Sequence, residues 1–244
     1  MEKEFRIKAK DGKQIYCKLR GSLEKPVIVF VHGFTGHMDE HLFYNAARFF
    51  EKKGFASLRF NLYGDQDDAR KLHECDLQTH AADLDRVVSY LKKKKAQDIF
   101  AVGHSYGGPT IFLSDTKNYR ALVLWDASFH FKALFKNKEY SKELKGFCKE
   151  WAFKFFIGQK FVTEAEKLEK TFWQTVSQNK APTKVVLTEN GNARSPLKKD
   201  FFTALNEPKE MLEMKKTGHT FSEDTAAEKL FQETLKWLRK FGKK

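Results

Sequence analysis

Two spacings of apolar residues alternate along the chain. Continuous apolar runs predict strands buried on both faces of a sheet, and they lie at 26–31, 56–60, 99–102, 120–125 and 184–188. Apolar residues three or four positions apart predict helices at 39–53, 77–95 and 222–241, and a short helix is expected at 109–115. This alternation predicts an α/β protein with a mostly parallel sheet and helices on both of its faces.

The two ends of the chain complete the predicted sheet. Segments 5–9 and 14–20 alternate apolar and polar residues around Asp11-Gly12, which predicts an antiparallel hairpin. Segment 210–214 is the last predicted strand, followed by the closing helix. The sheet is therefore expected to have eight strands.

Segment 129–180 interrupts this alternation of strand and helix patterns. It has no evident strand pattern and is rich in phenylalanine and tryptophan. We expect a helical cap in which some aromatic side chains belong to the core and others line a cleft. A cap inserted in one α/β domain suits a chain of 244 residues.

The stretch 99–108, Ile-Phe-Ala-Val-Gly-His-Ser-Tyr-Gly-Gly, has the pattern of a nucleophile elbow. In such a turn a buried strand bends sharply into a helix and exposes a serine hydroxyl, here that of Ser105, above the sheet edge. Gly103 and Gly107 leave room for close backbone approach. A strand pattern before the motif and a helix pattern after it are the context that the motif requires.

Two other stretches match this elbow. The strand at 26–31 ends in His32-Gly33-Phe34-Thr35-Gly36, and His219 follows the last predicted strand in Thr217-Gly218-His219. A serine followed late in the chain by a histidine is the order found in α/β-hydrolases. Together these stretches resemble the α/β-hydrolase fold, and most closely its cinnamoyl and feruloyl esterase branch.

The resemblance covers almost the whole chain and weakens between 129 and 180. It implies a core in two parts, 1–128 and 181–244, with the cap at 129–180 between them. It also implies that Ser105 is the nucleophile, that His219 is the base, and that the backbone amides of Phe34 and Tyr106 form the oxyanion hole. No cofactor is implied.

The acid of the triad departs from the family pattern. Most members carry an aspartate after the strand at 184–188, where this chain has Asn192, which cannot carry the compensating charge. Asp126 directly follows the strand at 120–125, and some lipases of this fold supply their acid from that position. We expect Asp126 to be the acid, with Glu189 as the alternative and Asp200 as a more distant one.

Charge and cysteine content change this picture little. The net charge is +13, but the lysines are scattered and no nucleic-acid motif accompanies them, so we expect no nucleic-acid partner. The three cysteines, Cys17, Cys75 and Cys148, lack the spacing of a zinc site or a disulfide framework and are expected to be free thiols.

Other classes of protein are not indicated. There is no apolar run long enough to span a membrane and no signal-peptide core, which favours a cytoplasmic protein. His37-Met38-Asp39-Glu40-His41 matches a short zinc motif, H-x-x-E-H, but no third ligand is indicated and we expect no metal.

The sequence therefore predicts a serine carboxylesterase acting on small to medium acyl or aryl esters, with a small-molecule ester as its partner. A lipase or acyl-thioesterase with the same triad is one alternative. A non-catalytic binding protein on a hydrolase scaffold is the other, because the usual acid is missing at Asn192.

Overall fold

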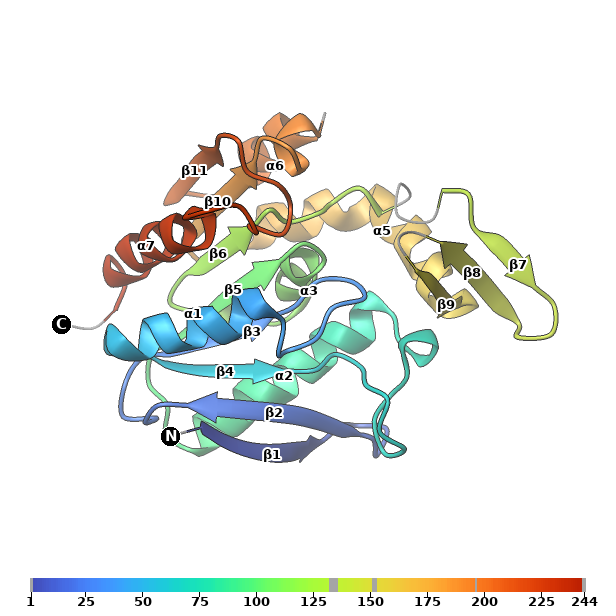
Figure 1. The fold of residues 1–244 in the computed structure, drawn as a ribbon, viewed down its shortest axis with the longest axis horizontal. Coiled ribbons are helices and arrows are strands. Elements are labelled where there is room, and N and C mark those ends of the chain that lie inside the picture. Colours follow the sequence, from blue (N-terminus) through green and yellow to red (C-terminus); the bar gives the residue numbers. More distant parts are fainter. Residues whose placement is uncertain (1, 132–135, 151–152, 196, 243–244) are drawn as a thin grey trace.

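The computed structural model describes residues 2–131, 136–150, 153–195 and 197–242. Its main element is an eight-stranded sheet in the order β1-β2-β4-β3-β5-β6-β10-β11 (Figure 1). The strands are β1 (Glu2–Lys8), β2 (Gln14–Arg20), β3 (Val27–Val31), β4 (Ala56–Phe60), β5 (Ile99–His104), β6 (Leu122–Trp125), β10 (Thr183–Thr188) and β11 (Lys209–Met214). β2 runs antiparallel to β1 and β4, and the other pairs are parallel. The predicted fold class and strand number are confirmed.

Helices cover both faces of the sheet, as Figure 1 shows. α1 (His41–Lys52) and α7 (Ala226–Arg239) pack on one face, where Phe30, Val102 and Trp125 form a core with their apolar residues. α2 (Leu77–Lys93), α3 (Gly107–Leu113) and α5 (Gln159–Gln178) cover the other face. The remaining helices are short: η1 (Leu72–Glu74), η2 (Thr116–Asn118), η3 (Asn192–Arg194) and α6 (Lys198–Ala204).

Segment 129–180 contains strands as well as a helix. β7 (Glu139–Ser141), β8 (Gly146–Glu150) and β9 (Lys154–Gly158) form a second, antiparallel sheet that projects beside α5 (Figure 1). The expectation that this segment holds no strand is wrong. Tyr140 pairs with Phe147, and Phe147 pairs with Ile157, across strands too short to give a clear pattern. The turn between the first two strands ends at Lys145 with a φ of 50° and is rich in lysine and glutamate instead of the usual turn residues. The helix of this segment is α5, whose buried face joins the main core.

The closing helix begins at Ala226, four residues later than the pattern at 222–241 suggests. Phe221 and Thr225 have positive φ angles of 54° and 62°, which interrupt a right-handed helix. Glu223 accepts a hydrogen bond from the Gly218 N–H at 2.7 Å, which ties this turn to the loop before His219.

The register of the sheet brings the predicted site residues together at the carboxyl ends of its parallel strands. His104 pairs with Trp125, Trp125 pairs with Val186, and Thr188 pairs with Met214. Since the strands are parallel, the residues that follow β5, β6, β10 and β11 leave the sheet side by side. No helix in the described ranges is long and apolar enough to cross a membrane.

Candidate active site

Ser105 occupies the strained turn that a nucleophile elbow requires. Its φ is 52°, in the left-handed region that non-glycine residues rarely adopt, and its N–H donates to the Trp125 carbonyl at 3.0 Å. A Cβ added at Gly103 would lie 2.6 Å from the backbone of Gly107, and one added at Gly107 would collide with the Val31 carbonyl. Both motif glycines are therefore needed for backbone approach.

The loop after β3 passes directly beside this serine. A Cβ added at Gly33 would lie 3.0 Å from the Cβ of Ser105. His32 fixes the loop, because its Nε2 accepts from the Leu62 N–H at 3.0 Å and its Nδ1–H therefore donates to the Gly33 carbonyl at 2.8 Å. Burial lowers the pKa of His32 to about 4, so the ring is neutral at pH 7.

The two residues expected to form the oxyanion hole lie on either side of Ser105 in this arrangement. Phe34 follows Gly33, and Tyr106 is the N-cap of α3. The N–H groups at the start of a helix have no acceptor within the helix and can donate to another group. The rings of Phe34 and Tyr106 contact each other, with centroids 5.6 Å apart. The structure thus brings both residues to the nucleophile elbow.

His219 and Asp126 are hydrogen-bonded to each other. The Nδ1 of His219 lies 2.5 Å from Oδ2 of Asp126. The Asp126 side chain is fully buried, whereas that of His219 is 38% exposed. A neutral imidazole that donates from Nδ1 leaves Nε2 as its acceptor, which is the tautomer a general base needs.

Donors from the end of β10 and from the loop after it contact the Asp126 carboxylate. Oδ1 accepts from the Thr188 N–H at 2.8 Å, and Oδ2 accepts from the Asn192 N–H at 3.1 Å. The φ of Asp126 is 43°, so the chain bends sharply where β6 ends. These donors stabilise a buried negative charge that the apolar surroundings alone would disfavour.

The Ser105 hydroxyl is turned toward Ser128 in this structure, with 3.4 Å between the two Oγ atoms. Within the described ranges no hydrogen bond joins the Ser105 hydroxyl to His219. The two residues are linked through His104, whose ring lies 4.7 Å from that of His219 and whose Nε2 donates to the His219 carbonyl at 2.8 Å. Burial lowers the pKa of His104 to about 4, which keeps this linking ring neutral.

The two alternative acids lie elsewhere. Glu189 accepts from the Lys216 N–H at 2.8 Å, and this hydrogen bond lowers the pKa of its carboxyl group. Asp200 lies exposed in the first turn of α6. Neither carboxylate is hydrogen-bonded to His219 among the described residues, so Asp126 alone has the geometry of the acid.

The histidines of the H-x-x-E-H motif have local partners. The ring of His37 accepts from the Asp39 N–H, and that of His41 contacts the Asn45 amide. In the described part of the chain, no three His, Cys, Asp or Glu side chains are grouped as metal ligands would be. The three cysteines are free thiols, as predicted.

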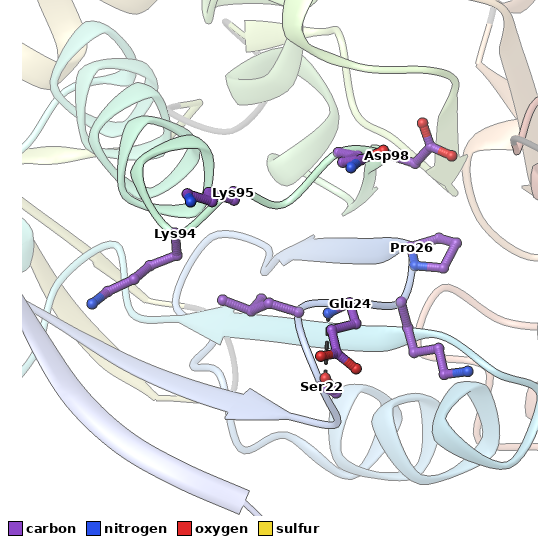
Figure 2. A pocket seen from close by; sticks show the side chains of 9 residues that line it. Ser22, Glu24, Pro26, Lys94, Lys95 and Asp98 are labelled. Carbon is purple, nitrogen blue, oxygen red and sulfur yellow. Dashed lines mark hydrogen bonds between the residues drawn. The ribbon is translucent and has the colours of Figure 1, made fainter.

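A cavity of 570 Å³ lies at the amino ends of β3 and β5, at the opposite end of these strands from the candidate site (Figure 2). It is lined by the loop before β3, including Ser22, Glu24 and Pro26, and by Lys94, Lys95 and Asp98 before β5. It contains none of the predicted site residues. The lining residues precede β3 and β5, whereas Ser105 follows β5. The length of the strands therefore separates the cavity from the elbow.

Sequence reasoning misses two features of this site. Ser128 lies beside Ser105 only because the chain bends at Asp126, and no motif marks it. The sequence marks Asn192 as a departure from the family pattern but not as a partner of Asp126, with which its side-chain amide makes contacts of 2.6 and 3.3 Å. A polar residue replacing an expected acid is the only available signal.

Comparison with known proteins supports the architecture. The family described as the alpha/beta hydrolase fold matches residues 26–114. No curated protein matches the chain by sequence.

Three solved structures share the overall fold at low sequence identity. Est1E from Butyrivibrio proteoclasticus with bound ferulic acid has a TM-score of 0.81 at 18% identity, over 97% of this chain and 98% of that one. The esterase domain of a Rhodothermus marinus protein has a TM-score of 0.77 at 17% identity, over 99% of both chains. A monoacylglycerol lipase from Paleococcus ferrophilus has a TM-score of 0.70 at 16% identity, over 93% of this chain and 99% of that one.

Proposed function

We propose that this chain, which has the α/β-hydrolase fold, is a serine carboxylesterase that forms an acyl-enzyme on Ser105. The observation that carries the proposal is the 2.5 Å contact between His219 and the buried Asp126, placed beside a serine with a φ of 52°. A structural serine in a surface turn needs neither the strained backbone nor a histidine hydrogen-bonded to a buried carboxylate next to it.

In the first half of the proposed reaction, the Ser105 hydroxyl attacks the ester carbonyl carbon. Nε2 of His219 accepts the hydroxyl proton, and Asp126 stabilises the imidazolium that forms. The N–H groups of Phe34 and Tyr106 donate to the oxyanion. When the tetrahedral intermediate collapses, the ester C–O bond breaks and the departing alcohol takes the proton from His219.

In the second half, water attacks the acyl-enzyme. His219 accepts a proton from that water, the bond between the acyl group and Ser105 Oγ breaks, and Ser105 regains its proton. The products are a carboxylic acid and the free enzyme. For this cycle the Ser105 hydroxyl must turn from Ser128 toward His219 when substrate binds, and catalytic hydrogen bonds commonly tighten in that complex.

Aromatic side chains beside the oxyanion loop support small to medium acyl or aryl esters as substrates. The ring of Phe34 lies 5.5 Å from that of Phe155 and 5.2 Å from that of Phe161. Phe155 in turn lies 5.9 Å from Phe153, which is half exposed. In our proposal residues 129–180 act as a cap. The partly exposed rings of Phe34, Phe153 and Phe155 contact the apolar part of the ester, and the fully buried ring of Phe161 supports them.

The neighbours suggest which esters to test. Est1E binds ferulic acid, and the Paleococcus protein is a monoacylglycerol lipase. Feruloyl esters, monoacylglycerols and acyl thioesters, alongside p-nitrophenyl esters of rising chain length, cover the proposed carboxylesterase activity and the lipase or thioesterase alternative. A substrate profile of the purified protein separates these activities.

A non-catalytic binding protein is the second candidate. It is favoured by the Ser105 hydroxyl, which contacts Ser128 and not His219 in the described structure. A fluorophosphonate probe distinguishes the two, because an activated serine forms a P–O bond to the probe and displaces fluoride. We expect labelling of the native protein and none of Ser105→Ala. An unlabelled native protein without ester hydrolysis would favour the binding protein.

A further inference from the structure

The side-chain amide of Asn192 lies between Asp126 and Ser128, whose hydroxyl is next to that of Ser105. Its Nδ2 is 2.6 Å from the backbone carbonyl oxygen of Asp126 and 3.3 Å from Oδ2 of the same residue. The same Nδ2 is 3.1 Å from Oγ of Ser128. One amide nitrogen therefore reaches three oxygen atoms of the candidate site.

These oxygen atoms require a donor at position 192. A carbonyl and a carboxylate only accept hydrogen bonds, so the amide of Asn192 must turn its nitrogen toward them. An aspartate at this position would face them with a second acceptor and a second negative charge. With Asp126 as the acid, an amide fits position 192 and a carboxylate does not.

The loop that carries Asn192 also packs closely against the side chain of Asp126. A Cβ at Gly191 would collide with Oδ2 of Asp126, so the absence of a side chain there lets the backbone approach. The Asn192 N–H then donates to the carboxylate at 3.1 Å. Backbone and side chain of Asn192 thus act on the same carboxylate.

The contact with Ser128 extends this arrangement to the nucleophile. The Ser128 hydroxyl accepts from Asn192, which leaves its own proton for another acceptor, and Oγ of Ser105 lies 3.4 Å away. The Ser128 N–H also donates to the Ser105 carbonyl at 3.1 Å. Asn192 is therefore connected to both Asp126 and Ser105.

We propose that Asn192 is a positioning residue that holds Asp126 on His219. This inference rests on the proposed esterase function and deepens it. It explains why an amide stands where the resemblance leads one to expect an acid. In this chain the carboxylate follows β6, and the residue after β10 supplies the donor that this carboxylate needs.

Steady-state hydrolysis of a p-nitrophenyl ester by the full chain tests the proposal. Asn192→Ala should lower kcat roughly 10- to 100-fold with little change in KM, because misplacing a catalytic group by about 1 Å costs on that order. Asn190→Ala is the matched control, since Asn190 lies in the same loop and its side chain accepts a hydrogen bond from the exposed Arg194. It should keep the native kcat.

Non-additivity separates positioning from general structural support. In the Asp126→Asn background, Asn192→Ala should cost less than about 3-fold, because the carboxylate that Asn192 positions is already gone. If the two losses multiplied fully, Asn192 would not act through Asp126, and the proposal would be overturned. A native kcat in Asn192→Ala would overturn it as well.

Asn192→Asp gives an independent test and is nearly isosteric should Asn192→Ala fail to fold. The added charge should move the acid limb of the kcat/KM pH profile to higher pH, because it favours protonated His219. An unshifted limb would overturn the positioning role. A native protein without esterase activity would overturn the proposed function and this inference together, whereas an active native protein with unaffected Asn192 variants would overturn this inference alone.

Discussion

Nδ1 of His219 donates to Oδ2 of Asp126 across 2.5 Å, although 93 residues separate them in sequence. The sheet makes this possible, because β6 and β11 flank β10 and both carboxyl ends leave the same edge. The sharp bend at Asp126 and the turn before α7 then direct the two side chains toward each other. A buried carboxylate in this position gives a neighbouring imidazole a fixed tautomer.

Replacing the acid should affect turnover far more than binding. Asp126→Asn removes the negative charge and offers the wrong partner to Nδ1 of His219, so kcat should fall by roughly 10⁴ while KM changes little. Glu189→Gln is the control, since Glu189 is bonded to the Lys216 N–H instead. Steady-state kinetics of both variants check this, and a Glu189→Gln loss as large as that of Asp126→Asn would move the acid to Glu189.

The nucleophile and the base should act as one unit. Ser105→Ala and His219→Gln should each reduce hydrolysis by several powers of ten, and the double variant should be little worse than either. Single-turnover rates of the three variants measure this. Losses that multiply fully would mean that His219 does not activate Ser105.

Aromatic residues of the 129–180 segment should divide into two classes. Phe155→Ala removes a ring that contacts Phe34 and should change the ratio of aryl-ester to short-chain-ester activity. Phe172→Ala removes a fully buried ring and should lower the free energy of unfolding by about 3–5 kcal/mol with that ratio unchanged. Denaturant melts and substrate profiles of both variants distinguish a substrate-contacting ring from a core ring. An unchanged ratio in Phe155→Ala would argue that this ring does not touch substrate.

Buried neutral histidines should make the fold sensitive to mild acid. Burial lowers the pKa of His80 to about 3 from its ordinary value of 6.5. As pH falls below 6.5 the unfolded chain binds a proton that the folded ring does not, so stability decreases between pH 6.5 and 3. At pH 5 the loss from this one ring is about 2 kcal/mol.

His80→Phe should therefore show a flatter fall in the free energy of unfolding between pH 6.5 and about 5 than the native protein. The ring packs against Tyr63 and Phe161, so phenylalanine suits its surroundings. The exposed His37, replaced by Gln, serves as the control and should leave the slope unchanged. Equal slopes in the native protein and His80→Phe would show that His80 does not titrate on unfolding in this range.

The main sheet and the elbow are predictable because their signals are local. Buried strands such as β3 and β5 are continuous apolar runs, and Gly103 and Gly107 flank Ser105 at fixed spacing because the backbone contacts there exclude side chains. The same holds for His219, which lies in the short loop after β11. Patterns of this kind depend on neighbours in sequence.

The features that escape prediction depend on contacts between distant segments. β7–β9 are short, and their pairing is specified by one another and not by a strong turn signal. The partnership of Asn192 with Asp126 spans 66 residues and needs the positive φ of Asp126 to form. Sequence reasoning can mark Asn192 as unusual, but its role follows only from the distances to the oxygen atoms that it contacts.

The central claim, that Ser105 is an acylated nucleophile, is tested most directly by mass spectrometry of the protein quenched during turnover of p-nitrophenyl acetate. We expect the native protein to gain the mass of one acetyl group, and peptide mapping to place that group on Ser105. Ser105→Ala should gain none and release no p-nitrophenol above background. Acetyl transfer to another residue, or undiminished turnover by Ser105→Ala, would contradict the proposed mechanism.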